Sequence, residues 1–244
     1  MSAKTIVITG AGMGIGAETA RQVASGNRLI LHYYTSEKGA LMLQEELKPL
    51  CASVDIVEAN LTTDAGCVSL FRLIKERFPA LDVLVNNAGG MIARQSVKDL
   101  TWTHLADTFA LNTCSAMRIT GLCTELLQLG RNACVVNVTS IAMRHGAPSA
   151  TAYGAAKAAM DAFTRGAALE LAPRVRVNAV APGIIDTRFH ERMTSEEKMK
   201  QFISNTPLKR TGDVIDVART IRFLIESEFI TGETVDCNGG LTMR

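Results

Sequence analysis

Tyr153 and Lys157 stand four residues apart in the stretch AYGAAKA. Four residues is just over one helical turn, so on a helix the phenol and the ammonium lie one above the other on the same face. A free phenol has a pKa of about 10, and a neighbouring cation lowers that value toward the range of easy proton exchange. The pair therefore suits general acid or base chemistry, although long helices also carry such neighbours as ordinary amphipathic pairs.

A second group of residues suited to chemistry lies near the amino end, where TGAGMGIGAETA follows the apolar run TIVIT. Glycines at positions 10, 12, 14 and 16 permit the unusual backbone angles of a strand-to-helix turn and let backbone amides approach a diphosphate. The stretch fits the dinucleotide fingerprint GxGxxG/A at Gly12, Gly14 and Ala17, and also the spacing TGxxxGxG from Thr9. We expect a nucleotide site here rather than a structural turn alone.

The stretch LHYYTSEK, at the end of the second apolar run, bears on the choice of coenzyme. The dinucleotide fingerprint normally continues to an acid about 20 residues on, which holds the ribose hydroxyls of NAD. Here no acid precedes Glu37, whereas the hydroxyls of Thr35 and Ser36 and the ammonium of Lys38 suit a 2′-phosphate. The stretch favours NADP(H), with NAD(H) possible, because Ser36 is equally suited to cap a helix and Lys38 to face water.

The hydrophobic pattern predicts the elements that position these groups. Apolar runs rich in β-branched residues predict buried strands that begin at Thr5, Arg28, Ser53, Asp82, Cys134 and Val175. The segments between them predict helices over 16–25, 37–50, 64–78, 103–129 and 152–171. This alternation predicts an α/β fold with a single doubly wound parallel sheet of the Rossmann type, flanked by helices on both faces. No linker or repeat divides residues 1–244, so we expect one domain, with the polar segment 187–207 as a mobile substrate lid or a solvated helix pair.

Composition narrows the classes of partner. A formal charge of +2, from 26 basic and 24 acidic residues mixed along the chain, argues against a nucleic-acid face or a membrane patch and favours a small-molecule ligand. The six cysteines form no CxxC and no Cys/His cluster, which suggests neither a metal site nor a disulfide framework. The first apolar run is too short for a signal segment or a membrane span. We expect a soluble, cytoplasmic protein.

Several motifs occur together and in a familiar order. With TGAGMGIG, NNAG at Asn86–Gly89, Asn112, Ser140, YGAAK at Tyr153–Lys157 and PGIIDT at Pro182–Thr187, the chain resembles the short-chain dehydrogenase/reductases over essentially its whole length. Ser140 precedes Tyr153 by thirteen residues. The ending FITGETVDCNGG is similar to that of the 3-oxoacyl-[acyl-carrier-protein] reductases and their sugar- and alcohol-specific relatives.

The resemblance implies four catalytic residues. Tyr153 would protonate a carbonyl oxygen as hydride arrives, or act as the base in reverse, and Lys157 would lower the pKa of that phenol and hydrogen-bond the nicotinamide ribose. Ser140 would join Tyr153 in binding the substrate oxygen, and the amide of Asn112 would hold a water in the proton relay. A strand-end serine turn and an exposed mid-helix asparagine are the plainer interpretations of the last two residues.

The coenzyme contacts implied by the resemblance come from segments far apart in the chain. The Ile185 backbone would meet the nicotinamide carboxamide, and the Thr187 hydroxyl an amide or a phosphate. Asn60 stands where most relatives carry an aspartate that faces the adenine amino group, and Met13 where many NADP-preferring relatives carry a basic residue. The full set is Gly10, Gly12, Met13, Gly14, Ile15, Gly16, Thr35, Ser36, Asn60, Leu61, Asn87, Ala88, Gly89, Tyr153, Lys157, Pro182, Gly183, Ile185 and Thr187.

The leading hypothesis is an NADPH-dependent reductase of a small or carrier-linked 3-oxo substrate. An NAD(P)-dependent sugar, polyol or alcohol dehydrogenase with the same residues is the alternative, and a catalytically idle nucleotide-binding protein is disfavoured by the intact catalytic set. The resemblance implies a homotetramer or dimer that pairs through the long helices beside the active site and the final strand. The faces of ALNTCSAMRITGLC and AAMDAFTRGAALEL are compatible with this, although a monomer would also bury such faces. The substrate pocket is expected to be lined by segment 187–207 and by Met91, Ile92, Ile141, Arg144 and His145, where Arg144, His145 and Arg188 either meet an anion or remain solvated.

Overall fold

The computed structural model describes residues 3–187 and 195–243. One sheet of seven parallel strands runs through it in the order β3-β2-β1-β4-β5-β6-β7. The predicted fold class is confirmed, and all six predicted strands are present. The strands are β1 (Thr5–Ile8), β2 (Arg28–Tyr33), β3 (Ser53–Glu58), β4 (Val83–Asn86), β5 (Ala133–Val138), β6 (Val175–Pro182) and β7 (Thr234–Cys237).

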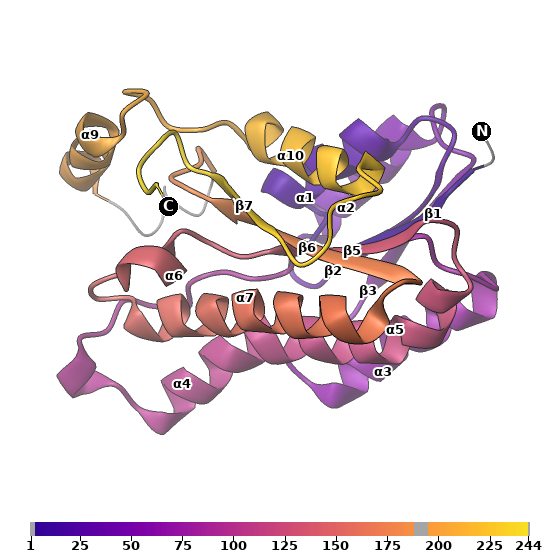
Figure 1. The fold of residues 1–244 in the computed structure, drawn as a ribbon, viewed down its shortest axis with the longest axis horizontal. Helices are drawn as coiled ribbons and strands as arrows, with labels where there is room; N and C mark the ends of the chain where they lie inside the picture. Colours follow the sequence, from indigo (N-terminus) through magenta and orange to yellow (C-terminus); the bar gives the residue numbers. More distant parts are fainter. Residues whose placement is uncertain (1–2, 188–194, 244) are drawn as a thin grey trace.

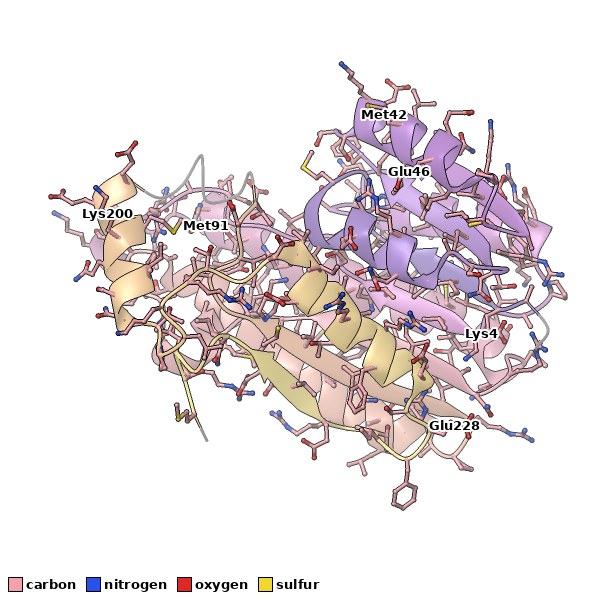
Figure 2. All side chains as sticks on the ribbon, turned by 90° about the horizontal axis from the view of Figure 1, so that it is seen from above. Lys4, Met42, Glu46, Met91, Lys200 and Glu228 are labelled. Atoms are coloured by element: carbon pink, nitrogen blue, oxygen red, sulfur yellow. The ribbon has the colours of Figure 1, made fainter. Side chains whose placement is uncertain are left out.

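Helices cover both faces of the sheet (Figure 1). One layer holds α1 (Gly14–Val23), α2 (Glu37–Leu47) and α10 (Val214–Glu226), and Figure 2 looks onto it, with Met42 and Glu46 marking α2. The other holds α3 (Asp64–Arg77), α4 (Trp102–Phe109), α5 (Ser115–Gln128) and α7 (Thr151–Leu171). Side chains alternate between the faces along each strand, so Ile6 and Ile8 join the first core and Val7 the second.

The strand order reverses at β1, which pairs with β2 on one side and with β4 on the other. In open parallel sheets, ligands bind in the crevice outside the carboxyl ends of the strands at such a switch point. The glycine-rich turn follows β1 and the NNAG segment follows β4, so the fold places both predicted coenzyme segments at this crevice.

The predicted helix over 103–129 differs from a regular helix. Between α4 and α5 the chain forms a single π-helical turn, η2 (Ala110–Cys114), with Asn112 at its centre. The Asn112 side chain pairs with the Gly90 backbone of a neighbouring loop, and Thr113 Oγ1 donates to the Ala156 carbonyl on α7. Such turns concentrate at functional sites, because one extra residue re-aims the groups on the helix.

The carboxyl-terminal part adds elements that the hydrophobic pattern did not predict, namely β7 and α10. Within segment 187–207 the structure has α9 (Glu196–Asn205), and residues 188–194, with the predicted anion contact Arg188, lie outside the described residues. The remaining short helices are η1 (Val97–Asp99) and α6 (Ala142–His145). Within residues 3–187 and 195–243, no helix is long and apolar enough to cross a membrane.

Candidate active site

Tyr153 and Lys157 occupy adjacent turns of α7, and Lys157 Nζ lies 5.9 Å from the centroid of the Tyr153 ring. The ammonium donates a hydrogen bond of 2.8 Å to the Val138 carbonyl at the end of β5. Lys157 is buried, and burial lowers its pKa to about 8, because a charged amine is less stable away from water. The predicted acid and cation thus share one face of the helix.

Ser140 lies two residues after the end of β5 and hydrogen-bonds the Tyr153 side chain. Burial raises the pKa of Tyr153 above its ordinary value, and the bond with Ser140 opposes that rise only in part. The phenol is therefore protonated at neutral pH, which is the form a general acid needs. Tyr153 also packs against an apolar cluster of Met91, Ala142, Ala147 and Ala150, so the predicted pocket residue Met91 lies beside the acid.

The amide of Asn112 is engaged by the protein backbone. Its Nδ2 donates to the carbonyls of Gly90, at 2.8 Å, and Thr108, at 3.0 Å, while its Oδ1 accepts from the Gly90 amide at 2.9 Å. Both amide hydrogens are used, so a relay water can bond to this side chain only by donating to Oδ1. The water-holding role of Asn112 stays a prediction. What the contacts establish is that Asn112 fixes the loop after Gly89.

The glycine-rich turn has the backbone that a diphosphate requires. Gly10 and Gly14 have φ angles of +64° and +57°, which other residues rarely adopt. A Cβ on Gly16 would lie 2.5 Å from the Gly10 carbonyl, so only glycine fits there. Met13 caps α1 without a side-chain hydrogen bond, and the first turn holds no acid. The free amides and positive end of the helix dipole therefore suit the diphosphate of a dinucleotide.

Polar contacts between Thr9 and the NNAG segment join the loops on either side of the crevice. Thr9 Oγ1 accepts from the backbone amides of Asn87 and Ala88 at 3.0 and 2.9 Å. Asn87 Nδ2 in turn donates to the carbonyls of Thr9 and Gly10 at 2.9 and 3.0 Å. Asn87 thus shapes the glycine turn with its side chain, so its contribution to coenzyme binding need not be direct.

Ser36 lies against the glycine turn, since a Cβ added to Gly12 would be 2.1 Å from its Oγ. Ser36 is the residue that caps α2, yet its hydroxyl makes no capping hydrogen bond. The hydroxyl is therefore available to a ligand at this turn. Thr35 and Lys38 are exposed close by in the chain, and Met13 is 47% exposed.

The loop after β3 uses Asn60 in its own structure. Asn60 Oδ1 accepts hydrogen bonds from the Thr62 amide at 3.1 Å and from Thr62 Oγ1 at 2.7 Å. The oxygen predicted to face an adenine amino group therefore already closes a turn, an interaction that competes with the ligand. The side chain of the next predicted contact, Leu61, is buried in the second core, so only its backbone could meet a ligand.

The segment after β6 returns toward the glycine turn. Gly183 packs so closely on Asn238 that a Cβ would lie 2.7 Å from the Asn238 Cα. Ile185 forms a parallel bridge with Gly212, in which the Gly212 amide donates to the Ile184 carbonyl and the Asp186 amide donates to the Gly212 carbonyl. The amide of Ile185 itself therefore points away from Gly212. Thr187 Cγ2 lies 3.9 Å from the position a Gly14 Cβ would occupy. The structure thus brings Thr187 to the glycine turn, as a shared coenzyme site requires.

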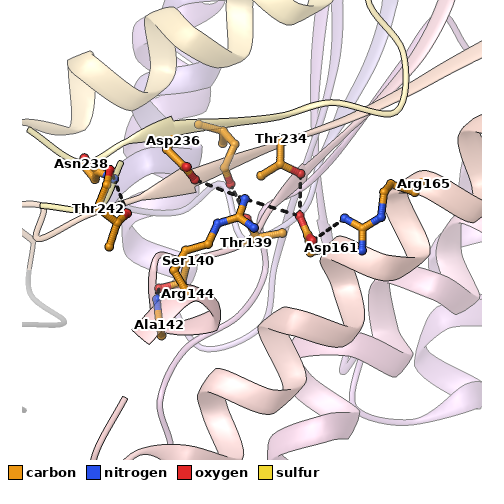
Figure 3. Close-up of polar contacts among 11 residues, drawn as sticks. Thr139, Ser140, Ala142, Arg144, Asp161, Arg165, Thr234, Asp236, Asn238 and Thr242 are labelled. Carbon is orange, nitrogen blue, oxygen red and sulfur yellow. Dashed lines mark hydrogen bonds and ion pairs between the residues drawn. The ribbon is translucent and has the colours of Figure 1, made fainter. Parts of the chain in front are cut away.

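Arg144 does not point into a substrate pocket. Its guanidinium lies between two carboxylates, with Nη2 3.4 Å from Asp236 Oδ1 and 3.9 Å from Asp161 Oδ1 (Figure 3). Asp161 also pairs with Arg165 and accepts from Thr234 Oγ1 at 2.7 Å. This group of four charged residues, which we call the Arg144 cluster, ties α6 to α7 and β7.

Two further features bear on the expected pocket. His145 is exposed at the end of α6, where its Nδ1 accepts from the Ala147 amide at 3.2 Å. A cavity of about 530 Å³ continues from Ile184 and Ile185 to the chain after β7, including Gly240 and Met243. Neither Ser140 nor Tyr153 is among the described residues that line this cavity, whereas the predicted coenzyme contact Ile185 is.

His32 is a buried residue, next to the predicted coenzyme segments, that the sequence did not single out. Its imidazole is buried at the end of β2 and hydrogen-bonds both Gly10 and Ala59, which begin two coenzyme segments. The available signal was an ionisable residue in an otherwise apolar strand. That signal shows that a partner must exist, but the partners themselves come from β1 and β3.

Comparison with known proteins agrees with this geometry. The family model described as enoyl-(acyl carrier protein) reductase matches residues 10–242. A 3-oxoacyl-[acyl-carrier-protein] reductase of Synechocystis is 34% identical, with 100% of this chain and 98% of the relative covered. A 7α-hydroxysteroid dehydrogenase of Bacteroides fragilis is also 34% identical, covering 99% of this chain and 95% of its own.

Solved structures give the same result. A short-chain dehydrogenase/reductase from Brucella melitensis superposes with a TM-score of 0.91 at 30% identity, covering 100% of this chain and 98% of its own. A 7α-hydroxysteroid dehydrogenase complexed with NADH and a 7-oxo bile acid has a TM-score of 0.91 at 25% identity, with coverages of 98% and 94%. The chain belongs to the short-chain dehydrogenase/reductase family. It is an oxidoreductase of that family, for which a nicotinamide coenzyme is supported.

Proposed function

We propose that this enzyme is an NADPH-dependent reductase that converts the carbonyl of a 3-oxo substrate to a hydroxyl. The observation that carries the proposal is the placement of the Tyr153 phenol, which hydrogen-bonds Ser140 and has Lys157 one helical turn away. The reduced nicotinamide supplies the hydride to the carbonyl carbon. Tyr153 delivers its proton to the carbonyl oxygen, and Ser140 orients that oxygen. The nearby Lys157 ammonium stabilises the phenolate that remains.

Replacement of Tyr153 tests the proton transfer. The variant Tyr153→Phe removes the acid and keeps the ring, so we expect turnover to fall by roughly 10²- to 10⁴-fold while the dissociation constant of the coenzyme changes little. Steady-state kinetics and a fluorescence titration with the reduced coenzyme measure the two quantities. Full turnover in this variant would exclude the proposed acid.

The preference for NADPH rests on the residues beside the glycine turn. The Ser36 hydroxyl lies against Gly12 and makes no capping hydrogen bond, and Thr35 and Lys38 are exposed close by in the chain. These three groups suit a 2′-phosphate. We expect Ser36→Asp to weaken NADPH binding through charge repulsion and to leave NADH binding nearly unchanged. Equal affinity of the wild-type protein for NADH and NADPH would contradict the proposal.

A second candidate is an NAD(P)-dependent sugar, polyol or alcohol dehydrogenase, favoured by the Bacteroides fragilis relative at the same 34% identity. The same four residues serve that reaction, with Tyr153 as the base. A screen of 3-oxoacyl thioesters, ketones and secondary alcohols with each coenzyme, followed by nicotinamide absorbance, separates the two. A 2-enoyl thioester belongs in the screen, because the matching family model carries that description.

The finer properties of the molecule follow the same proposal. We infer a homotetramer or dimer that pairs through α5 and α7, and a substrate lid that includes α9. All six cysteines lie in the described part of the chain and carry free thiols, which suits a reducing cytoplasm.

A further inference from the structure

His32 lies at the end of β2, between the strands that precede the glycine turn and the loop of Asn60. Its side chain is 3% exposed. Alternation along the strand places it on the same face as Ile30, toward the second core. A buried ionisable group in such a place needs partners on both nitrogens.

The partners of the imidazole define one protonation state. Nδ1 lies 3.0 Å from the Gly10 amide nitrogen, which can only donate, so Nδ1 is bare. Nε2 lies 2.9 Å from the Ala59 carbonyl oxygen, which can only accept, so Nε2 carries the proton. His32 is therefore the neutral Nε2–H tautomer, and burial holds its pKa below the ordinary value.

These two bonds join segments that approach the coenzyme from opposite sides of β2. Gly10 opens the glycine turn, and Ala59 directly precedes Asn60 and Leu61. The backbone reinforces the connection, because the Ala11 amide donates to the His32 carbonyl at 2.8 Å and the Ala59 amide to the Tyr33 carbonyl at 3.1 Å. The amides of Gly10 and Ala11 are thus occupied, which leaves a diphosphate the amides at the start of α1.

We propose that His32 is a positioning residue for the coenzyme: its neutral imidazole holds the glycine turn and the Ala59–Leu61 loop at a fixed separation. The inference rests on the proposed use of a nicotinamide coenzyme at this edge of the sheet. A second proton would place an N–H against the Gly10 amide and break the connection. The nearest ionisable residues on the strands, Tyr33 of β2 and Glu58 of β3, pair with each other one position beyond His32. Their side chains therefore point to the face of the sheet opposite to that of His32. From the other elements around the imidazole, Gly10 and Ala59 contribute backbone groups, and no ionised side chain of the described residues shifts its pKa.

The test compares coenzyme binding in variants at position 32. His32→Leu removes both bonds, and His32→Asn restores an acceptor close to the position of Nδ1. We expect the dissociation constant of NADPH, measured by fluorescence titration, to rise about tenfold in His32→Leu. In His32→Asn it should return most of the way to the wild-type value. Ile30→Val, a truncation on the same strand and face, is the control for lost core packing and should bind NADPH as the wild type does.

The pH dependence of coenzyme binding provides a second test. Its affinity for NADPH should fall as the pH is lowered through the pKa of His32, whereas in folded His32→Asn this component should be absent. Wild-type affinity in His32→Leu, failure of His32→Asn to bind better than His32→Leu, or the same acid dependence in wild type and His32→Asn would each overturn the inference. Should the wild type bind neither NADPH nor NADH, the proposed function itself fails, which is a different result from unchanged binding in the His32 variants.

Discussion

At the scale of the residue, Lys157 is a buried cation whose ammonium donates a hydrogen bond to the Val138 carbonyl. Its pKa of about 8 means that the amine loses its charge just above neutral pH. The ammonium form is present below that pH and disappears as the pH rises through it. Under the proposed mechanism the charge stabilises the phenolate of Tyr153, so loss of the proton from Lys157 would remove that stabilisation.

We therefore expect kcat/KM for the coenzyme, which reports on the free enzyme, to fall above a pH of about 8 with the loss of one proton. A series of initial rates from pH 6 to 10 at low coenzyme concentration measures this profile. Rates at saturating coenzyme serve as the comparison, because they report on the bound state. A profile without a descending limb up to pH 10 would show that the charge of Lys157 is not required.

Gly89 gives a second prediction at this scale. A Cβ there would lie 2.9 Å from both Asn112 Oδ1 and Lys157 Nζ, so an alanine must displace two catalytic candidates at once. We expect Gly89→Ala to lower kcat by about 10- to 100-fold, since small misplacements of catalytic groups are costly. Gly90→Ala is the matched control, because a Cβ there meets nothing within 4 Å. Equal kcat values for the two variants would contradict the crowding argument.

At the scale of the element, α2 supports the glycine turn from outside the coenzyme site. A Cβ on Gly39, in the first turn of α2, would lie 2.0 Å from the Gly12 carbonyl oxygen. The helix can therefore pack against the turn only through a residue without a side chain. The position of α2 thus depends on the same turn that is proposed to bind the diphosphate.

The variant Gly39→Ala separates helix propensity from this packing. Alanine favours a helix by about 1 kcal/mol over glycine, yet here we expect coenzyme affinity to fall several-fold, because the Gly12 backbone must move. Met42→Ala, at a position 65% exposed on the same helix, is the control. Calorimetric titration of the coenzyme measures both variants, and unchanged affinity in Gly39→Ala would show that the turn adapts without loss.

Elements differ in how much of them the sequence predicts. Continuous β-branched runs identified six strands, because strands buried on both faces need little else. The seventh, TVDC, escaped prediction because its apolar run is interrupted by Asp236, whose charge is paired with Arg144 of a distant helix. The π-turn around Asn112 also escaped prediction, because the Asn112 side chain hydrogen-bonds the backbone of Gly90, which belongs to a different segment. The candidate pair Tyr153 and Lys157 was indicated by spacing, and Ser140 and Asn112 by the family resemblance, whereas His32 required knowledge of which loops flank β2.

At the scale of the whole molecule, α7 presents a row of small exposed residues away from the sheet. Ala155, Ala158, Ala162 and Gly166 follow one another at helical spacing and lead to Leu169, which is 83% exposed. Small side chains allow close approach of a second helix, and a stable interface buries roughly 1,200–2,000 Å² in total. This row is the face through which we propose that copies pair.

We expect Ala162→Arg to shift the protein to a smaller oligomer, because a guanidinium at the centre of a close helix contact must be desolvated without a partner. Size-exclusion chromatography with light scattering gives the mass of the particle. Met42→Arg, on the opposite layer, is the control for added charge. An Ala162→Arg variant that keeps the wild-type mass would place the interface elsewhere.

The Arg144 cluster has a practical consequence for how the protein is handled. Because Arg144 connects the segment after Ser140 to Asp236 on the last strand, a force on the chain beyond that strand is transmitted toward Ser140, the proposed substrate-binding serine. The chain there also folds tightly, with Asn238 Nδ2 bonding Thr242. Sequence at the amino end instead leads into the first residues of β1, at the amino ends of the strands, whereas the candidate site lies at their carboxyl ends (Figure 1). A purification tag therefore belongs at the amino end, and a carboxyl-terminal fusion is expected to depress activity in proportion to the strain it imposes.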